Sequence, residues 1–277
     1  MEFRHFAGVC EMSDRMTFEQ INKRKYEGET YSPESITELP KQNDPRDYSG
    51  RMLQLKFELI RQYCGGRRLL DVCCGNGLHL LNFADNRDLA VGVDFSRPFI
   101  EHANKLKRDA NFSNVEFLHC DAKAMPLADN SFDAAYSLAA LYHIPSVESA
   151  ISEISRVLRL GGQCVLDMGN LYSLNTIACR AYSEVAQGCH VPYSNIRRMI
   201  LNSGFDIVEH RCFQLLPMWA RKPIWLWPLL HPVWERVLCW RMGDRMLDER
   251  ISSLPIIRRM AFRHILVCAK QGGGTSA

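Results

Sequence analysis

Short apolar segments alternate with amphipathic helical segments through most of this 277-residue chain. The clearest helical pattern covers 147–158, with apolar residues on one helix face, and we expect Gly161-Gly162 to end this helix. Strands that alternate with helices form a mostly parallel sheet, because each connecting helix crosses a face of the sheet. The expected strands are 68–72, 89–93, 115–119, 132–137, 163–168, 205–213 and 262–270.

The chain length and the pattern of turns indicate one domain with an arm and an insertion. Residues 1–50 are polar and rich in turn residues, which predicts an N-terminal arm or lid. Residues 51–277 then form the main domain. Within it, residues 214–261 separate the last two strands, far more than the roughly two to five residues of a hairpin connection. We therefore expect 214–261 to be an insertion with a function of its own.

Composition restricts the compartment and the partners. The eleven cysteines show no C-x-x-C pair and no His/Cys spacing typical of zinc sites, so we expect reduced thiols in a cytoplasmic protein. The N-terminus lacks the apolar run of a signal peptide, and charged and proline residues interrupt the apolar stretch 224–240. The net charge of +3 is too small to predict general binding to a polyanion.

The most informative motif is Asp71-Val-Cys-Cys-Gly75-Asn-Gly77, which follows an apolar strand. Closely spaced glycines allow backbone N–H groups to approach a small polar ligand where the next helix begins. Because the phosphate-binding pattern G-x-x-x-x-G-K-[ST] is absent, a nucleoside cofactor is the favoured ligand.

Two more strands of the expected sheet end in aspartate. Asp94 ends the second strand, where a carboxylate can accept hydrogen bonds from the two ribose hydroxyls, and Phe95 can flank the adenine. Asp121 and Ala122 follow the third strand. A single aspartate at a strand end is more often a cap or turn residue. Three such residues, counting Asp71, together favour a cofactor site at the carboxyl edge of the sheet.

The segment 69–167 resembles the class I S-adenosylmethionine-dependent methyltransferases, especially the branch of the ubiquinone and menaquinone C-methyltransferases. The resemblance implies a Rossmann-like α/β fold with a seven-stranded, mostly parallel sheet, helices on both faces and an antiparallel last strand. It also implies S-adenosylmethionine as methyl donor, S-adenosylhomocysteine as product, and no metal requirement. One departure is Cys73, which replaces the leading glycine of the family's G-x-G-x-G.

The resemblance assigns roles to single residues. In the family the acidic residue of the glycine motif, here Asp71, organises the amino group of the cofactor, and Asp121 meets the adenine amino group. The run from Pro126 to Ser137 matches the family's P-F-x-D-x-S-F-D pattern, and Ser137 is expected beside the methyl group. The cofactor-binding residues that we expect are therefore Asp71, Cys73, Gly75, Gly77, Asp94, Phe95, Asp121, Ala122 and Ser137.

Catalysis requires alignment of the acceptor, exclusion of water and a base. His143 follows the fourth strand and has a side chain suited to proton removal near neutral pH, with Tyr142 beside it. The alternative is that His143 packs against, or caps, the helix that begins near Ser146. Weaker candidates for substrate contact are His190, Tyr193 and Trp219.

All five tryptophans lie in the insertion, and residues 211–263 hold ten Lys or Arg against four Asp or Glu, a net charge of +6. Three explanations remain open. The tryptophans can form an apolar cap over a hydrophobic substrate, a surface (219–241) that contacts a membrane peripherally, or the core of an ordinary helical subdomain. No nucleic-acid module is recognisable, so we do not expect a nucleic-acid partner.

These patterns predict methyl transfer to oxygen or carbon of a small hydrophobic molecule, such as a quinone, an aromatic polyketide-like compound or a lipid intermediate. Two alternatives stay open. One is a methyltransferase acting on tRNA or protein, and the other is a non-catalytic regulatory subunit that binds the cofactor.

Overall fold

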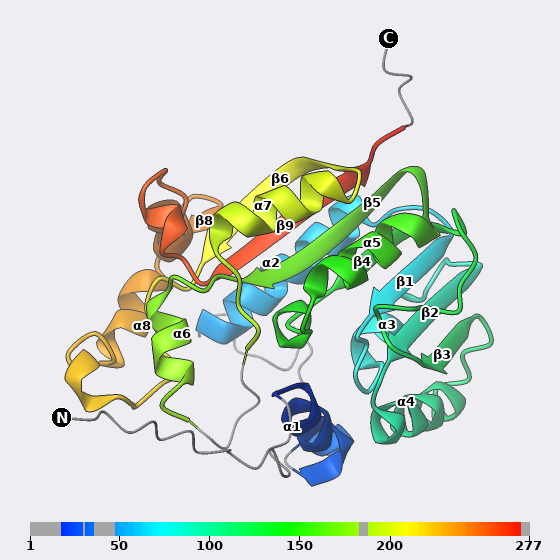
Figure 1. Cartoon of the computed structure of the whole chain (residues 1–277), viewed down its shortest axis with the longest axis horizontal. Coiled ribbons are helices and arrows are strands. Elements are labelled where there is room, and N and C mark those ends of the chain that lie inside the picture. Colours follow the sequence, from blue (N-terminus) through cyan, green and yellow to red (C-terminus); the bar gives the residue numbers. More distant parts are fainter. Residues whose placement is uncertain (1–17, 30, 36–47, 183–187, 273–277) are drawn as a thin grey trace, which may run out of the picture.

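The computed structural model describes residues 18–29, 31–35, 48–182 and 188–272. Its main feature is a seven-stranded sheet with the strand order β3-β2-β1-β4-β5-β9-β6 (Figure 1). The strands are β1 (Arg68–Val72), β2 (Leu89–Asp94), β3 (Val115–His119), β4 (Phe132–Ser137), β5 (Leu158–Gly169), β6 (Phe205–Phe213) and β9 (Arg263–Lys270).

The sheet is parallel except at β9. Strand β1 pairs in parallel with β2 and with β4, whereas β9 runs antiparallel to both of its neighbours, β5 and β6. The expected seven-stranded, mostly parallel sheet with an antiparallel last strand is confirmed. Because β1 to β5 all point the same way, the carboxyl ends of β1, β2, β3 and β4 lie along one edge of the sheet.

Helices cover both faces of the sheet and enclose two apolar layers (Figure 1). One layer includes Phe57 of α2, Leu80 of α3 and Ile100 of α4. The other includes Ile151 of α5 and Ile200 of α7. The helices are α1 (Phe18–Arg24), α2 (Tyr48–Tyr63), α3 (Leu78–Phe83), α4 (Arg97–Asp109), α5 (Val147–Val157), α6 (Leu174–Cys179), α7 (Tyr193–Asn202), α8 (Val233–Leu238) and α9 (Leu247–Ser252).

The expectation that Gly161-Gly162 ends a helix is wrong. Helix α5 ends at Val157, and Leu158 already has extended backbone and begins β5. The glycines lie inside that strand. A Cβ atom on Gly162 would come within 3.0 Å of backbone oxygens of Arg159 and Asp133, so this position is tightly packed against the neighbouring backbone. Gly162 therefore permits close strand packing, whereas Gly161 has open space around it and a left-handed φ of 72°.

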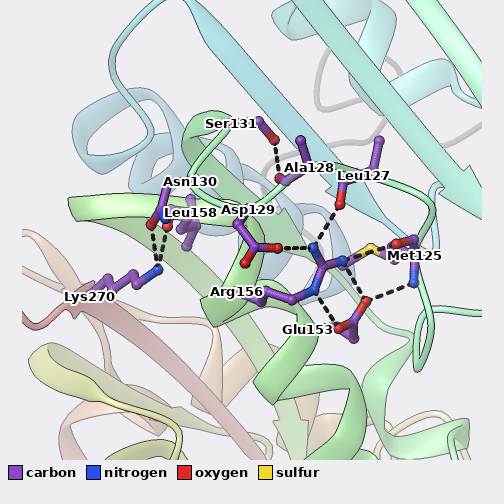
Figure 2. A network of polar contacts seen from close by, with 10 residues as sticks. All are labelled: Met125, Leu127, Ala128, Asp129, Asn130, Ser131, Glu153, Arg156, Leu158 and Lys270. Carbon is purple, nitrogen blue, oxygen red and sulfur yellow. Dashed lines mark hydrogen bonds and ion pairs between the residues drawn. The ribbon is translucent and has the colours of Figure 1, made fainter.

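A network centred on Arg156 of α5 fixes the loop that leads into β4 (Figure 2). The Arg156 guanidinium donates to the backbone oxygens of Met125 and Leu127 and pairs with Asp129 and Glu153. The Glu153 carboxylate also accepts from the backbone N–H of Met125 at 2.8 Å. Because this loop begins close to Asp121, the network also stabilises one side of the carboxyl edge.

The segment between β6 and β9 holds α8 and α9, the two-stranded hairpin of β7 (Arg241–Met242) and β8 (Arg245–Met246), and two short 3-10 helices. It lies at the end of the molecule away from β3 and α4 (Figure 1). Part of it packs on α6, because Ala220, Leu226 and Leu230 form a small apolar cluster with Ala178. Across the described residues, no helix combines the length and apolar character needed to cross a membrane.

Candidate cofactor site

A cavity of about 480 Å³ lies at the carboxyl edge of the sheet. Its walls come from the glycine loop after β1, the end of β2, the loops after β3 and β4, and the N-terminal arm. The lining residues include Tyr26, Cys73, Gly75, Asn76, His79, Asp94, Phe95, Asp121, Ala122, Leu138, His143 and Ile144. Seven residues named from the sequence therefore meet here: Cys73, Gly75, Asp94, Phe95, Asp121, Ala122 and His143.

The glycine loop turns sharply because three of its residues have left-handed backbone. The φ angles are 63° at Cys73, 53° at Gly75 and 77° at Gly77. Cys73 thus keeps the conformation usually reserved for glycine, at some cost in backbone energy. Gly77 is also required by packing, since a Cβ atom there would lie 2.4 Å from the Phe117 ring. Gly77 itself does not line the cavity. Its role is to let the loop pack closely against Phe117.

Asp94 connects the end of β2 to the glycine loop. One carboxylate oxygen accepts from the backbone N–H of Gly75 and the other from that of Ser96, both at 2.9 Å. The side chain is buried yet reaches the cavity. Burial raises the pKa of Asp94, and the hydrogen bonds from Ser96 and Gly75 oppose that shift. A carboxylate has about four acceptor positions, so acceptor capacity remains for neighbouring hydroxyls.

The loop after β3 supplies a second, more open carboxylate. Asp121 is exposed, and its carboxylate accepts from the backbone N–H of Lys123 at 2.8 Å. Phe95 lies across from it on the loop after β2, and its backbone oxygen contacts Nε2 of His119 at 2.8 Å. An aromatic ring and a carboxylate on adjacent loops can hold a flat heterocycle that carries an amino group.

Asp71 lies outside the cavity lining, at the buried end of β1. Burial raises its pKa to about 8, the Tyr136 hydroxyl lowers it, and the charge of Asp94 raises it further. The Asp71 carboxyl therefore holds its proton more strongly than a solvated aspartate does. A cation bound nearby would favour its ionised form.

The loop after β4 forms the far wall. Ser137 is fully buried and does not face the cavity, whereas Leu138, Ala139 and Ala140, which follow it, do. His143 ends a short 3-10 helix (Leu141–His143) and also lines the wall. The cavity wall after β4 is therefore formed by residues 138–140 and, after a short buried stretch, by His143.

The other candidates do not line the cavity. Tyr142 is buried under Arg263, whose guanidinium carbon lies 4.5 Å from the ring centre, and burial raises the tyrosine pKa to about 12. His190 contacts the Thr176 hydroxyl at 2.8 Å, and burial lowers its pKa to about 3.

Tyr193 begins α7, and Trp219 lies in the insertion between β6 and β9. The Tyr193 ring stacks on two histidines of β6 and β9. The Trp219 indole donates to the side chain of Asn175 at 3.0 Å and packs on Tyr182. None of the five tryptophans lines the cavity.

The N-terminal arm contributes lining residues that the sequence patterns did not single out: Asn22, Lys23 and Tyr26. The Tyr26 ring lies 5.8 Å from that of His143 and 6.1 Å from that of Phe95, so it spans the two sides of the cavity. Its backbone oxygen accepts from the Ser96 hydroxyl at 2.8 Å. The sequence predicted only that residues 1–50 form an arm or lid. It contains no motif that marks Asn22, Lys23 or Tyr26 as lining residues.

Known proteins identify the class to which this site belongs. Residues 70–166 match the family model described as a methyltransferase domain. Demethylmenaquinone methyltransferase of Oceanobacillus iheyensis is 31% identical over 174 residues, which make up 53% of this chain and 73% of that protein. The chain therefore belongs to the class I S-adenosylmethionine-dependent methyltransferases, and the resemblance inferred from the motifs is confirmed.

Other relatives match over shorter parts. The 27-O-demethylrifamycin SV methyltransferase of Amycolatopsis mediterranei is 38% identical over 103 residues, or 36% of this chain and 38% of that protein. The chain thus spans less than two thirds of that relative's length. Geranyl diphosphate C-methyltransferase of Streptomyces coelicolor has the same fold, with a TM-score of 0.61, 14% identity, and coverage of 93% of this chain and 98% of that one.

Proposed function

We propose that the chain transfers a methyl group from S-adenosylmethionine to oxygen or carbon of a small hydrophobic molecule. The observation that carries this proposal is the joining of Asp94, Asp121, the glycine loop and His143 around one cavity. Relatives that act on a menaquinone precursor, a rifamycin and geranyl diphosphate support a small substrate. The apolar side chains of Leu138, Ile144 and Pro145 supply a matching wall.

Each part of the cavity has a task in this proposal. The remaining acceptor positions of Asp94 bind the two ribose hydroxyls, and Asp121 accepts from the adenine amino group. Phe95 packs on the adenine, and the glycine loop, with Asp71 behind it, faces the methionine portion. Tyr26, with Asn22 and Lys23, covers the ligand, which excludes water from the reacting atoms.

S-adenosylmethionine supplies a methyl carbon that bonds to the acceptor as the carbon–sulfur bond breaks, with the electron pair remaining on sulfur in S-adenosylhomocysteine. The chain has to orient the acceptor in line and remove its proton. His143 lies on the wall after β4 and is the proposed base. In this proposal Tyr142 positions the His143 ring, since the two ring centres are 4.5 Å apart.

The direct test is incubation of the purified chain with a labelled methyl donor and fractionated cell extract. We expect label in organic-soluble metabolites. Label confined to RNA or to protein would overturn the proposed substrate class and favour a polymer methyltransferase. Cofactor binding without any transferred label would instead identify a regulatory subunit.

The same assay tests His143. We expect His143→Gln to slow transfer by at least about 100-fold, because general-base catalysis contributes that much. The affinity for S-adenosylhomocysteine should change less than about threefold, since His143 acts on the acceptor. His102→Gln on α4, outside the cavity lining, is the matched control. Full activity in His143→Gln would leave the histidine with a structural role.

We further propose that the insertion brings the enzyme to an anionic membrane surface that carries its substrate. The exposed fractions of Ile224, Trp225, Trp227 and Trp240 are 83%, 68%, 53% and 64%. These apolar side chains share the segment with the surplus of arginine and lysine, a combination suited to the headgroup region. Tryptophans that filled a local core would be buried.

Vesicle sedimentation tests this surface. We expect the chain to bind phosphatidylglycerol vesicles more tightly than phosphatidylcholine vesicles, and Trp225→Ala with Trp227→Ala to weaken that binding by about tenfold or more, because both indoles lose apolar contact. Leu160→Ala, an exposed apolar residue on β5, is the control. Equal binding by the wild type to both lipids, or no effect of the tryptophan changes, would exclude an interfacial role.

A further inference from the structure

Three potential metal ligands meet on one face of the sheet, outside the cofactor cavity. They are His210 and Cys212 of β6 and His264 of β9. Cys212 is directly opposite His264 in the antiparallel pairing, and His210 is two residues before Cys212, so all three side chains leave the same face. Cys212 and His264 are buried, and His210 is partly buried.

The distances between the ligand atoms match one face of a tetrahedral metal site. Nε2 of His210 lies 2.9 Å from Nδ1 of His264, and Sγ of Cys212 lies 3.4 Å and 3.7 Å from these nitrogens. With Zn–N near 2.0–2.1 Å and Zn–S near 2.3 Å, tetrahedral geometry requires about 3.3 Å between nitrogens and about 3.6 Å between nitrogen and sulfur. The two imidazole nitrogens need to separate by about 0.4 Å, and Nε2 of His210 and Sγ of Cys212 by about 0.2 Å.

The environment also orients the ligands. Nε2 of His264 lies 3.2 Å from the backbone oxygen of Ala261, so that nitrogen carries the proton and Nδ1 presents its lone pair toward the cluster. A backbone carbonyl that fixes the far nitrogen of a histidine is a common feature of metal sites. The Tyr193 ring stacks on both imidazoles, at 4.8 Å from His264 and 5.6 Å from His210, and limits their rotation.

We propose that His210, Cys212 and His264 bind a Zn²⁺ ion. This ion would link β6 and β9, the two strands that flank the insertion. Two imidazoles and one thiolate are typical zinc ligands, whereas calcium and magnesium bind mainly to oxygen ligands. On binding, Cys212 loses its thiol proton to solvent and forms the metal–sulfur bond as thiolate, and a solvent molecule completes the coordination at the partly exposed His210 side. His210 and Cys212 lie just before residues 214–261, and His264 lies just after them. The ion therefore holds together β6 and β9, the strands between which the insertion begins and ends.

The rival arrangement is metal-free, with a direct hydrogen bond between the two imidazoles and a protonated Cys212. Cobalt titration of the chelator-treated full chain separates the two. We expect one equivalent of Co²⁺ to give a thiolate-to-cobalt absorption band, and Zn²⁺ to displace it stoichiometrically. Zn²⁺ should also raise the melting temperature of the chain.

Substitutions test whether His210 and Cys212 produce the cobalt absorption band and the zinc-dependent rise in melting temperature. Cys212→Ala and His210→Gln should abolish the band and the zinc-dependent rise in melting temperature. The control is Cys164→Ala, another buried cysteine of the sheet, in β5. His210→Gln changes a partly exposed edge residue, which keeps the test available if Cys212→Ala fails to fold. The absence of a cobalt band in the folded wild type, or a band that persists in Cys212→Ala, would overturn the proposal.

Discussion

Replacing Asp94 with asparagine should reduce the affinity for S-adenosylmethionine by at least about 100-fold. Each hydrogen bond to a charged acceptor contributes about 1.5–3 kcal/mol, and two such bonds to the ribose are proposed. The amide would also place a donor against the backbone N–H of Gly75 or Ser96, which both now donate to the carboxylate. Isothermal calorimetry measures the change directly.

Asp88→Asn is the matched control for Asp94→Asn. Asp88 precedes the opposite end of the same strand, is exposed and pairs with Arg67. We expect its loss to leave the affinity unchanged, because it is remote from the cavity lining. Circular dichroism establishes that both variants are folded. An Asp94→Asn variant that is folded and binds with wild-type affinity would remove Asp94 from the cofactor site.

Replacing Asp167 with asparagine should lower the free energy of unfolding by about 3–5 kcal/mol, because it removes the buried carboxylate that pairs with two cations. The Asp167 carboxylate lies 2.7 Å from Nζ of Lys56 and 3.1 Å from Nη1 of Arg263. It also accepts from the backbone N–H of Ala139 at 3.1 Å. Burial alone would raise the pKa of Asp167, but Arg263 and Lys56 hold it below its usual range.

Urea unfolding measures this loss, with Asp129→Asn as control. Asp129 pairs with Arg156, but its side chain is 68% exposed, so its loss should cost less than about 1 kcal/mol. If Asp167→Asn does not fold, adding Lys56→Met should restore part of the stability by removing one of the two cations that pair with Asp167. A loss of less than about 1 kcal/mol in Asp167→Asn would show that the two cations do not depend on it.

The strands and the carboxylate positions were predictable because they rest on local pattern. Apolar runs of strand length predicted β1 to β4, and each predicted strand begins and ends within one residue of the observed strand. In a parallel sheet the carboxyl ends share an edge, so Asp94 and Asp121 had to lie close together. The same reasoning could not tell that Asp71 is buried outside the cavity lining, since the lining depends on how the loops fold around the strand ends.

Features that depend on contacts between distant segments were not predictable. Tyr26 reaches the cavity from an arm with no regular pattern, and the pairing that holds it involves Ser96, 70 residues away. Similarly, His264 lies beside Cys212 because β6 and β9 pair across the insertion, and the spacing of these residues does not resemble a zinc motif. The Gly161-Gly162 pair looks like a helix stop in the sequence, but in the structure Gly161 supplies a left-handed residue and Gly162 a close backbone contact inside β5.

The proposed methyl transfer requires the cavity at the carboxyl edge to bind a sulfonium nucleoside. Calorimetry of the purified full chain, freed of endogenous ligand, with S-adenosylmethionine and S-adenosylhomocysteine tests it most directly. We expect one molecule bound per chain, with a dissociation constant between about 1 μM and 1 mM, the range typical of enzyme substrates. A folded chain that shows no saturable binding of either compound at millimolar concentration would contradict the account.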